Sequence, residues 1–262
     1  MSEIVKTEAV VLRSMKYLES SKIVTLYTRN FGKVSTIVKG ARQPKSKFGS
    51  SLEPMSYVSV VFYKKEGRDL QTLSQCDVLQ PFRMLSEDLG KMSVGLAIIE
   101  IVNAIAHDEE KNIPLFNLVI GVLTALNEAE KNFQSLLYAF EIHLSRILGF
   151  QPVFDRCISC DRPVGGHLPG EDEITFSLDR GGPQCGDCSG TGGRAFLVAR
   201  RNLITLQRIV SISHLPDVCA IDIQKEDRAE IGDFLWTYLY HHVSGMRSLR
   251  SEKIFAAILT DS

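Results

Sequence analysis

Apolar positions in the first 80 residues alternate with polar ones, which is the period of β-strands. Val, Ile, Thr and Tyr are frequent in five short runs, and turn signals separate these runs. The runs predict strands over residues 4–14, 22–28, 34–39, 57–63 and 70–78. Five short strands suit a small closed barrel, and the five-stranded OB-fold is a common nucleic-acid-binding form of such a barrel. An SH3-like or another small barrel is the alternative.

From residue 81 the apolar positions follow the period of helices that pack on one face. We interpret these stripes as core positions rather than as cofactor-binding residues. Asn132 is expected to be the N-cap of the third helix, and Gly149 is expected to stop it. The stripes predict helices that include residues 94–105, 116–126, 136–148, 203–210 and 231–246, and a short segment at 249–259 ends the chain.

Residues 151–194 interrupt the helices with a segment rich in Gly, Pro, Asp and Cys and poor in apolar residues. Such a segment buries too little to stay ordered without a metal. We therefore expect an α+β multidomain protein, in which an N-terminal OB-fold barrel precedes a helical bundle with an inserted four-cysteine zinc finger. The expected domains are the barrel at 1–80, the helical domain at 81–150 and 195–262, and the finger at 151–194.

Two Cys-X-X-Cys pairs carry the strongest chemical signal in the chain. Each pair can bind one ion from one side, and four thiolates complete the tetrahedron that zinc prefers in structural sites. Redox thiols or unrelated core cysteines are the alternatives, and Cys76 and Cys219 stand alone. His167 is the one histidine of the finger loop that could compete for the ion. The predicted ligands of a single structural zinc ion are Cys157, Cys160, Cys185 and Cys188.

Positive charge is concentrated at the front of a chain whose net charge is −1. Residues 1–83 carry 14 Lys and Arg against 7 Asp and Glu, and the remainder is acidic. A basic segment points to a polyanionic partner, and cations in a flexible loop after a strand suit phosphates. The residues expected to bind nucleic acid are Lys39, Arg42, Lys45 and Lys47 of this loop, with Arg13 and Lys22 from neighbouring strand ends.

Aromatic residues are interleaved with these cations, and stacking of a base on such a ring is worth about 1–3 kcal/mol. The alternative is a solvated surface loop, with Tyr27 and Tyr57 in the barrel core. The candidate stacking residues are Tyr17, Tyr27, Phe31, Phe48 and Tyr57.

The sequence contains no motif that is typical of an enzyme active site. Gly32-Lys33 lacks the spacing of a phosphate-binding P-loop, and no Gly-X-Ser-X-Gly or His-Glu-X-X-His motif is present. Four sulfur ligands also leave no open position on zinc, so the predicted metal is structural and no enzyme is expected. We interpret His143 as a core-edge residue and His241-His242 as surface or cap positions, while Arg200-Arg201 stays undecided between an anion contact and a solvated pair.

The compartment is inferred from the start of the chain and from its most apolar window. The first six residues lack the basic start and apolar run of a signal peptide. The window at 93–106 is too short to cross a bilayer, which needs about 20 residues. We therefore expect a cytoplasmic protein with no membrane partner.

Short motifs then recur along the chain in a particular order. At the front these are Glu8 to Arg13, Glu19-Ser20-Ser21, Leu26-Tyr27-Thr28, Gly32-Lys33, and Val38 to Arg42 followed by Lys45-Ser46. Later come Leu148-Gly149-Phe150-Gln151-Pro152, the two cysteine pairs with Phe176-Ser177 and Gly181-Gly182 between them, and Arg247-Ser248-Leu249-Arg250-Ser251. Together, in their order and spacing, the motifs resemble the RecO family of bacterial recombination mediators.

This resemblance implies an OB-fold, a helical domain with an inserted zinc finger, and a nucleoid-associated place in the bacterial cytoplasm. It implies binding of single- and double-stranded DNA, annealing of complementary strands, and help in loading the RecA recombinase onto strands covered by single-stranded DNA-binding protein. The implied partners are RecR, in some members RecF, and the acidic C-terminal tail of single-stranded DNA-binding protein. A zinc-dependent nucleic-acid-processing enzyme and a structural adaptor are the alternative functions.

Overall fold

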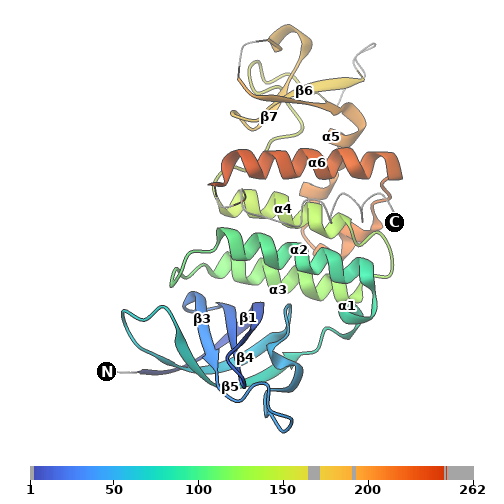
Figure 1. The fold of residues 1–262 in the computed structure, drawn as a ribbon. Helices are drawn as coiled ribbons and strands as arrows, with labels where there is room; N and C mark the ends of the chain where they lie inside the picture. Colours follow the sequence, from blue (N-terminus) through green and yellow to red (C-terminus); the bar gives the residue numbers. More distant parts are fainter. Residues whose placement is uncertain (1–2, 165–171, 191–192, 245, 247–262) are drawn as a thin grey trace. The chain divides into compact units, whose positions relative to one another are not determined.

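The computed structural model describes residues 3–164, 172–190, 193–244 and 246 (Figure 1). The chain divides into two compact units, Met1–Asn127 and Glu128–Ser262. The first unit holds the strands of the barrel and the helices up to residue 127, so the four-part division from the sequence stays a prediction. His167, the basic motif at 247–251 and the segment at 249–259 lie outside the described residues.

Five strands of the first unit form a closed barrel with the order β1-β2-β3-β5-β4. All neighbouring strands are antiparallel except β3 and β5, which pair in parallel through Thr36–Gln71 and Ile37–Thr72. This topology, with β1 paired to both β2 and β4, is that of the OB-fold and confirms the predicted architecture. The strands are β1 (Glu3–Tyr17), β2 (Ser21–Thr28), β3 (Gly32–Val38), β4 (Tyr57–Lys64) and β5 (Gln71–Gln80).

The interior of the barrel is filled by alternate side chains of each strand. On β2 and β3 the inward positions are Val24 and Leu26, and Val34 and Val38. Phe48 and Leu52, from the loop between β3 and β4 and its 3-10 turn at Gly49–Leu52, join the same core. The β3–β4 loop is therefore anchored in the barrel at one end, and its cationic part lies before this anchor.

Helices of the first unit cover part of the outer barrel surface. They are α1 (Arg83–Glu87), α2 (Leu89–Ile105) and α3 (Ile113–Glu128), and Figure 1 shows α2 and α3 side by side. Tyr27 is buried and Tyr57 is half-buried, and both rings lie against Phe116 of α3, at centroid distances of 6.2 and 6.4 Å. These tyrosines therefore face α3 outside the barrel, which corrects the alternative that placed them in the barrel core.

The described residues of the second unit form three α-helices. They are α4 (Ser135–Ile147), α5 (Arg200–Ser211) and α6 (Lys225–His242), and α4 contacts both of the others. At the end of α4, Gly149 has φ +89°. The Gly149 N–H donates to the Arg146 carbonyl and the Phe150 N–H to the Ser145 carbonyl, so the predicted glycine stop is confirmed as a Schellman motif.

The predicted N-cap of α4 is wrong. Asn132 adopts φ +49°, and its side-chain amide donates to the Cys219 carbonyl at 3.2 Å instead of capping the helix. Gln134 is the residue before the first turn, and it makes no side-chain capping bond. A short polar side chain that is at ease in the left-handed region explains why Asn132 suits this turn.

Two strands of the inserted segment and one strand directly after it form a three-stranded sheet that the sequence did not predict. Its strands are β6 (Glu173–Ser177), β7 (Gly182–Gln184) and β8 (Ala195–Ala199), in the order β7-β6-β8. Phe176 of β6 packs edge-on against Phe234 of α6 with centroids 4.7 Å apart, and Phe196 and Phe154 contact the same ring. An aromatic cluster therefore holds the sheet on α6 in addition to any metal.

Among the helices that the structure describes, none combines the length and the apolar character that a bilayer crossing needs.

Candidate metal centre and nucleic-acid surface

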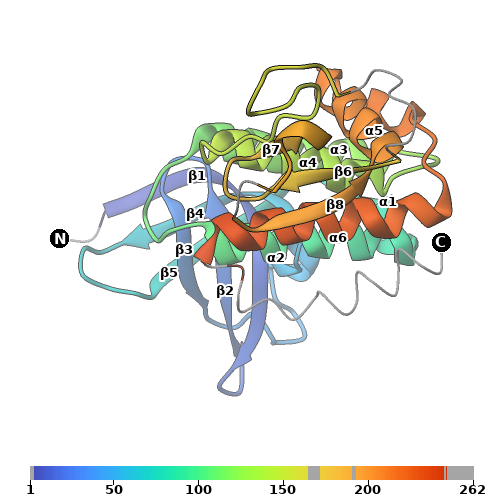
Figure 2. The same ribbon diagram turned by 90° about the horizontal axis from the view of Figure 1, so that it is seen from above.

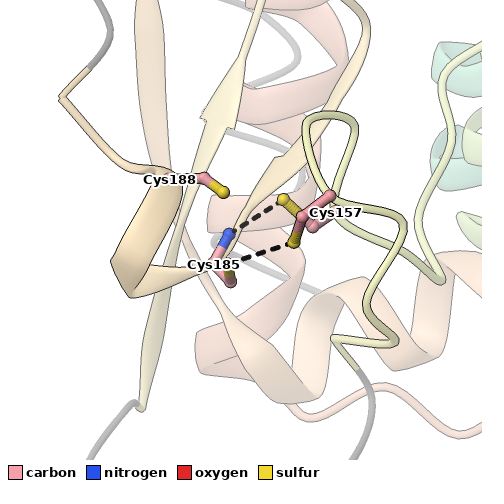
Figure 3. Close-up of side chains that lie close together, drawn as sticks. Cys157, Cys185 and Cys188 are labelled. Carbon is pink, nitrogen blue, oxygen red and sulfur yellow. Dashed lines mark hydrogen bonds between the residues drawn. The ribbon is translucent and has the colours of Figure 1, made fainter.

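Four cysteine side chains come together in the inserted segment, from a turn before β6 and from the 3-10 turn at Gly186–Cys188. Their sulfur atoms all lie within 4.8 Å of one another, and Cys160 and Cys185 are 3.7 Å apart. Figure 3 shows Cys157, Cys185 and Cys188 lying close together. A tetrahedral zinc ion with Zn–S bonds of about 2.3 Å separates its sulfurs by about 3.8 Å, so the cluster fits zinc.

Backbone hydrogen bonds shape both cysteine turns. The Asp161 N–H donates to the Cys157 carbonyl, and the Cys188 and Ser189 N–H groups donate to the Cys185 carbonyl. The Cys185 N–H also donates to the Cys157 sulfur at 3.4 Å. Burial raises the pKa of the Cys157 thiol. The N–H of Cys185 and those of Ser159 and Cys160 have the opposite effect, and together they lower this pKa to about 6. Cys157 therefore favours the thiolate form that binds metal.

Arginine side chains support the cysteine turns from outside. Arg162, beyond the first pair, forms a 2.9 Å ion pair with Asp187, between the cysteines of the second pair. Arg180 donates to the Ser159 hydroxyl at 2.9 Å and to the Ile158 carbonyl at 2.7 Å. The two X residues of the first Cys-X-X-Cys pair are thus fixed by the turn between β6 and β7.

Two histidines of α6 bind the same β6–β7 turn. His241 contacts Asp179 at 2.8 Å, and His242 contacts the Leu178 carbonyl at 2.9 Å. The Arg194 backbone N–H and then His241 hold the pKa of the Asp179 carboxyl below its ordinary value. The sequence suggested surface or cap positions for these histidines. The structure instead shows that they tie the end of α6 to the finger, and no sequence spacing could have indicated this pairing.

The cationic loop after β3 contains the four predicted loop residues. Lys39 and Lys45 are exposed and form no side-chain hydrogen bond or ion pair with the described residues. Arg42 donates from its side chain to the Leu18 carbonyl at 2.9 Å, and its N–H donates to the Ser20 carbonyl. Lys47 donates to the Ser74 carbonyl at 2.7 Å. The loop is thus bound to the β1–β2 turn, and its cations have no carboxylate partner among the described residues.

The other two residues predicted to bind nucleic acid, Arg13 and Lys22, differ in exposure and in ion pairing. Arg13 is exposed on β1, where it lies opposite Thr25 after an irregularity in the β1–β2 register. Lys22 forms a 2.8 Å ion pair with Glu53, and only 18% of its side chain is exposed. Part of the charge of Lys22 is therefore compensated within the protein, whereas that of Arg13 faces solvent.

The predicted stacking residues lie in different environments. Phe48 is in the barrel core, Tyr27 and Tyr57 lie against α3, and Phe31 packs on Phe62 at 5.9 Å. Only Tyr17 of this set is exposed, at the end of β1. The burial of Tyr27 could have been predicted from the sequence. β2 carries apolar side chains at consecutive positions, and this pattern indicates a strand that is buried on both faces.

The barrel, the helices and the four-cysteine insertion place the chain among multidomain OB-fold proteins that carry a finger in a helical unit. The chain matches the profile "Recombination protein O N terminal" over residues 1–82 and "Recombination protein O C terminal" over residues 86–252. The protein therefore belongs to the RecO family of bacterial DNA repair proteins.

Curated relatives support the same assignment. The DNA repair protein RecO of Salinibacter ruber is 39% identical over 234 residues, which cover 88% of this chain and 87% of the relative. That of Pelodictyon phaeoclathratiforme is 34% identical over 248 residues, or 92% of each chain. Membership in this family means a role in DNA repair and recombination.

Proposed function

We propose that the protein binds single- and double-stranded DNA on the cationic side of its barrel, anneals complementary strands, and helps load RecA onto strands covered by single-stranded DNA-binding protein. The observation that carries this proposal is the β3–β4 loop, whose four cations lie within nine residues and lack carboxylate partners in the described part of the chain. Uncompensated cations displace condensed counterions from DNA phosphates, which gives affinity without sequence preference.

The individual contributions of the cations should differ. Lys39, Lys45 and Arg13 are exposed and carry full charges into solvent. Arg42 donates one side-chain N–H to the Leu18 carbonyl, and its guanidinium has further N–H donors for a phosphate. Lys22 is paired with Glu53 and contributes little in this proposal. The DNA path therefore follows the β3–β4 loop and the nearby β1–β2 hairpin rather than the surface around Glu53.

A double charge reversal, Lys39→Glu with Lys45→Glu, tests the surface. Fluorescence anisotropy with labelled oligonucleotides of two unrelated sequences should show weaker binding for both. The slope of log affinity against log salt should fall by about 0.7 for each lost phosphate contact on single strands. Lys131→Glu with Lys225→Glu makes the same change in net charge on exposed residues of the second unit. Equal affinity and salt slope in wild type and the Lys39/Lys45 variant would exclude the loop as the DNA surface.

We also propose one structural zinc ion bound by Cys157, Cys160, Cys185 and Cys188. The convergence of four sulfurs supports this, and a closed sulfur site has no place for a reacting water. The competing hypothesis is a zinc-dependent nucleic-acid-processing enzyme. Incubation of labelled single- and double-stranded DNA with the protein and Zn²⁺ or Mg²⁺ separates the two, because chelator-sensitive cleavage would contradict a mediator without catalysis.

RecR, RecF and the acidic tail of single-stranded DNA-binding protein are the partners of the proposed mediator. A strand-annealing assay, with and without single-stranded DNA-binding protein on the strands, measures the activity directly. Acceleration in both conditions supports a mediator, whereas DNA binding without any acceleration supports a structural adaptor.

A further inference from the structure

The β1–β2 hairpin ends in an apolar tip that no described residue covers. Figure 2 shows this hairpin projecting from the body of the barrel. At its tip, 73% of Leu18 is exposed, and Tyr17 and Met15 beside it on β1 are 38% and 39% exposed. Three large apolar side chains at a protruding turn form a surface that water solvates poorly, and such surfaces usually contact a ligand.

The backbone at the tip is also unusual. Leu18 has φ +51°, a left-handed conformation that bulky side chains rarely adopt. Turns of this kind ordinarily use Gly, Asn or Asp, which lack both the strain and the exposed apolar surface. Strained backbone tends to persist where surrounding contacts fix it and where function uses it. The fixing contacts are present here, because Arg42 donates to both the Leu18 and the Ser20 carbonyls.

Apolar surface continues from the tip onto the outer face of the sheet. Met15 lies opposite Ile23, and Ile23 lies opposite Ile37, in the registers of β1–β2 and β2–β3. Directly opposed residues of neighbouring strands point to the same face. Ile23 and Ile37 are half-buried, so the three side chains form a flat apolar strip of a kind on which a planar ring can lie.

The positive charge around the tip indicates which kind of ligand it binds. Arg13 and Lys16 are exposed on β1, and Lys39 and Arg42 are exposed in the β3–β4 loop. The nearby acids are Glu19 at the turn and Glu53, whose charge is paired with Lys22. An apolar element ringed by cations complements a ligand with planar apolar bases on an anionic backbone. The pattern thus favours nucleic acid over an uncharged protein pocket.

We propose that the β1–β2 tip is a wedge that inserts Leu18 against an unstacked base at a junction between single-stranded and duplex DNA. This inference rests on the proposed DNA-binding function and adds the structural form of DNA that the site takes. The neighbouring cations hold the flanking phosphates, and the strip of Met15, Ile23 and Ile37 receives the displaced base. Insertion of apolar side chains between base steps is an established way for proteins to open a stack.

Duplexes with a single-stranded tail and 2-aminopurine at the junction test the wedge, because the fluorescence of this base rises when it unstacks. The full-length wild type is expected to raise the signal at the junction but not in the middle of the duplex. Leu18→Asn keeps a residue suited to the left-handed region and removes the apolar side chain. It should lose most of the rise while anisotropy shows affinity within about threefold, because phosphate contacts dominate affinity.

Leu89→Asn is the matched control, because Leu89 is 76% exposed and lies at the start of α2. It should behave as the wild type. A rise that Leu18→Asn retains in full would overturn the wedge and leave the tip as a protein contact. DNA binding by the wild type without any rise at the junction would overturn the wedge alone, whereas absence of DNA binding would overturn the proposed function itself.

Discussion

Glu141 on α4 offers a sharp test of the reasoning about the second unit. Its side chain is buried, and its Oε2 atom has no hydrogen-bond partner among the described residues. Burial raises the pKa of this carboxyl well above its ordinary value near 4.5. In the folded protein the group therefore stays protonated at pH values where the unfolded chain ionises it.

The sign of the effect follows from proton linkage. Above the ordinary pKa of Glu141, unfolding releases its proton, so the free energy of unfolding falls as pH rises towards the raised pKa of the folded state. Within that window, each pH unit removes about 1.4 kcal/mol of stability. Below pH 4.5 the group is protonated in both states and the penalty disappears.

The variant Glu141→Gln removes the titration and keeps the shape of the side chain. Trp236 is the only tryptophan and lies on α6 in the same unit, so its fluorescence during urea unfolding reports on this unit. The stability difference between variant and wild type should increase as the pH rises from about 4.5 towards the raised pKa of the folded state, at up to about 1.4 kcal/mol per pH unit. Other groups that titrate equally in both proteins cancel in this difference.

The exposed Glu130→Gln is the matched control and should show no pH-dependent difference from the wild type. A constant difference between Glu141→Gln and wild type across this pH range would refute the reasoning. Such a result would mean that Glu141 ionises in the folded protein as easily as in the unfolded chain.

Two further substitutions, each with a matched control, test the barrel and the finger. Gly32 has φ +61°, and an added Cβ would fall on the Glu110 carbonyl oxygen, so Gly32→Ala should lower stability by more than about 2 kcal/mol. The control Gly67→Ala, at φ +70° with open space around it, should lower the free energy of unfolding by only about 1–2 kcal/mol. Urea unfolding followed by circular dichroism measures both variants, and an equal loss of stability in the two would contradict the steric argument. Cys185→Ser should abolish zinc content by metal analysis while the sheet stays seated through Phe176, whereas Cys219→Ser should retain zinc. Full zinc in Cys185→Ser would refute the site.

The strands of the barrel were predictable because each is buried on its inner face, and this burial produces an alternation of apolar and polar residues in the sequence. The observed strands begin and end within a few residues of the predicted ones. The parallel pair of β3 and β5 was not predictable from this period, because it depends on closure between strands that are distant in the chain. The position of Tyr27 against Phe116 was missed for the same reason, since both Phe116 and Asn112, which accepts from the Tyr27 hydroxyl 85 residues away, are distant from Tyr27 in the chain.

The metal cluster was predictable from spacing alone, because a Cys-X-X-Cys turn places two sulfurs on one side. The supporting contacts were not predictable. Arg180, Asp179 and the histidines of α6 meet only because three short strands form a sheet on Phe234. Those strands are three to five residues long, and β7 consists of Gly, Pro and Gln, so no periodic pattern reveals them.

The packing of Tyr27 against α3 determines which fragment of the chain that contains the barrel can fold independently. The Tyr27 hydroxyl donates to the Asn112 carbonyl, and Lys33 donates to the Asn103 carbonyl, so the barrel shares bonds with the chain beyond residue 100. A fragment cut after residue 82 would carry a bare aromatic face and lose both bonds. The smallest portion that could be exchanged between proteins, or emerge from a ribosome and fold by itself, thus extends through α3 to about residue 127.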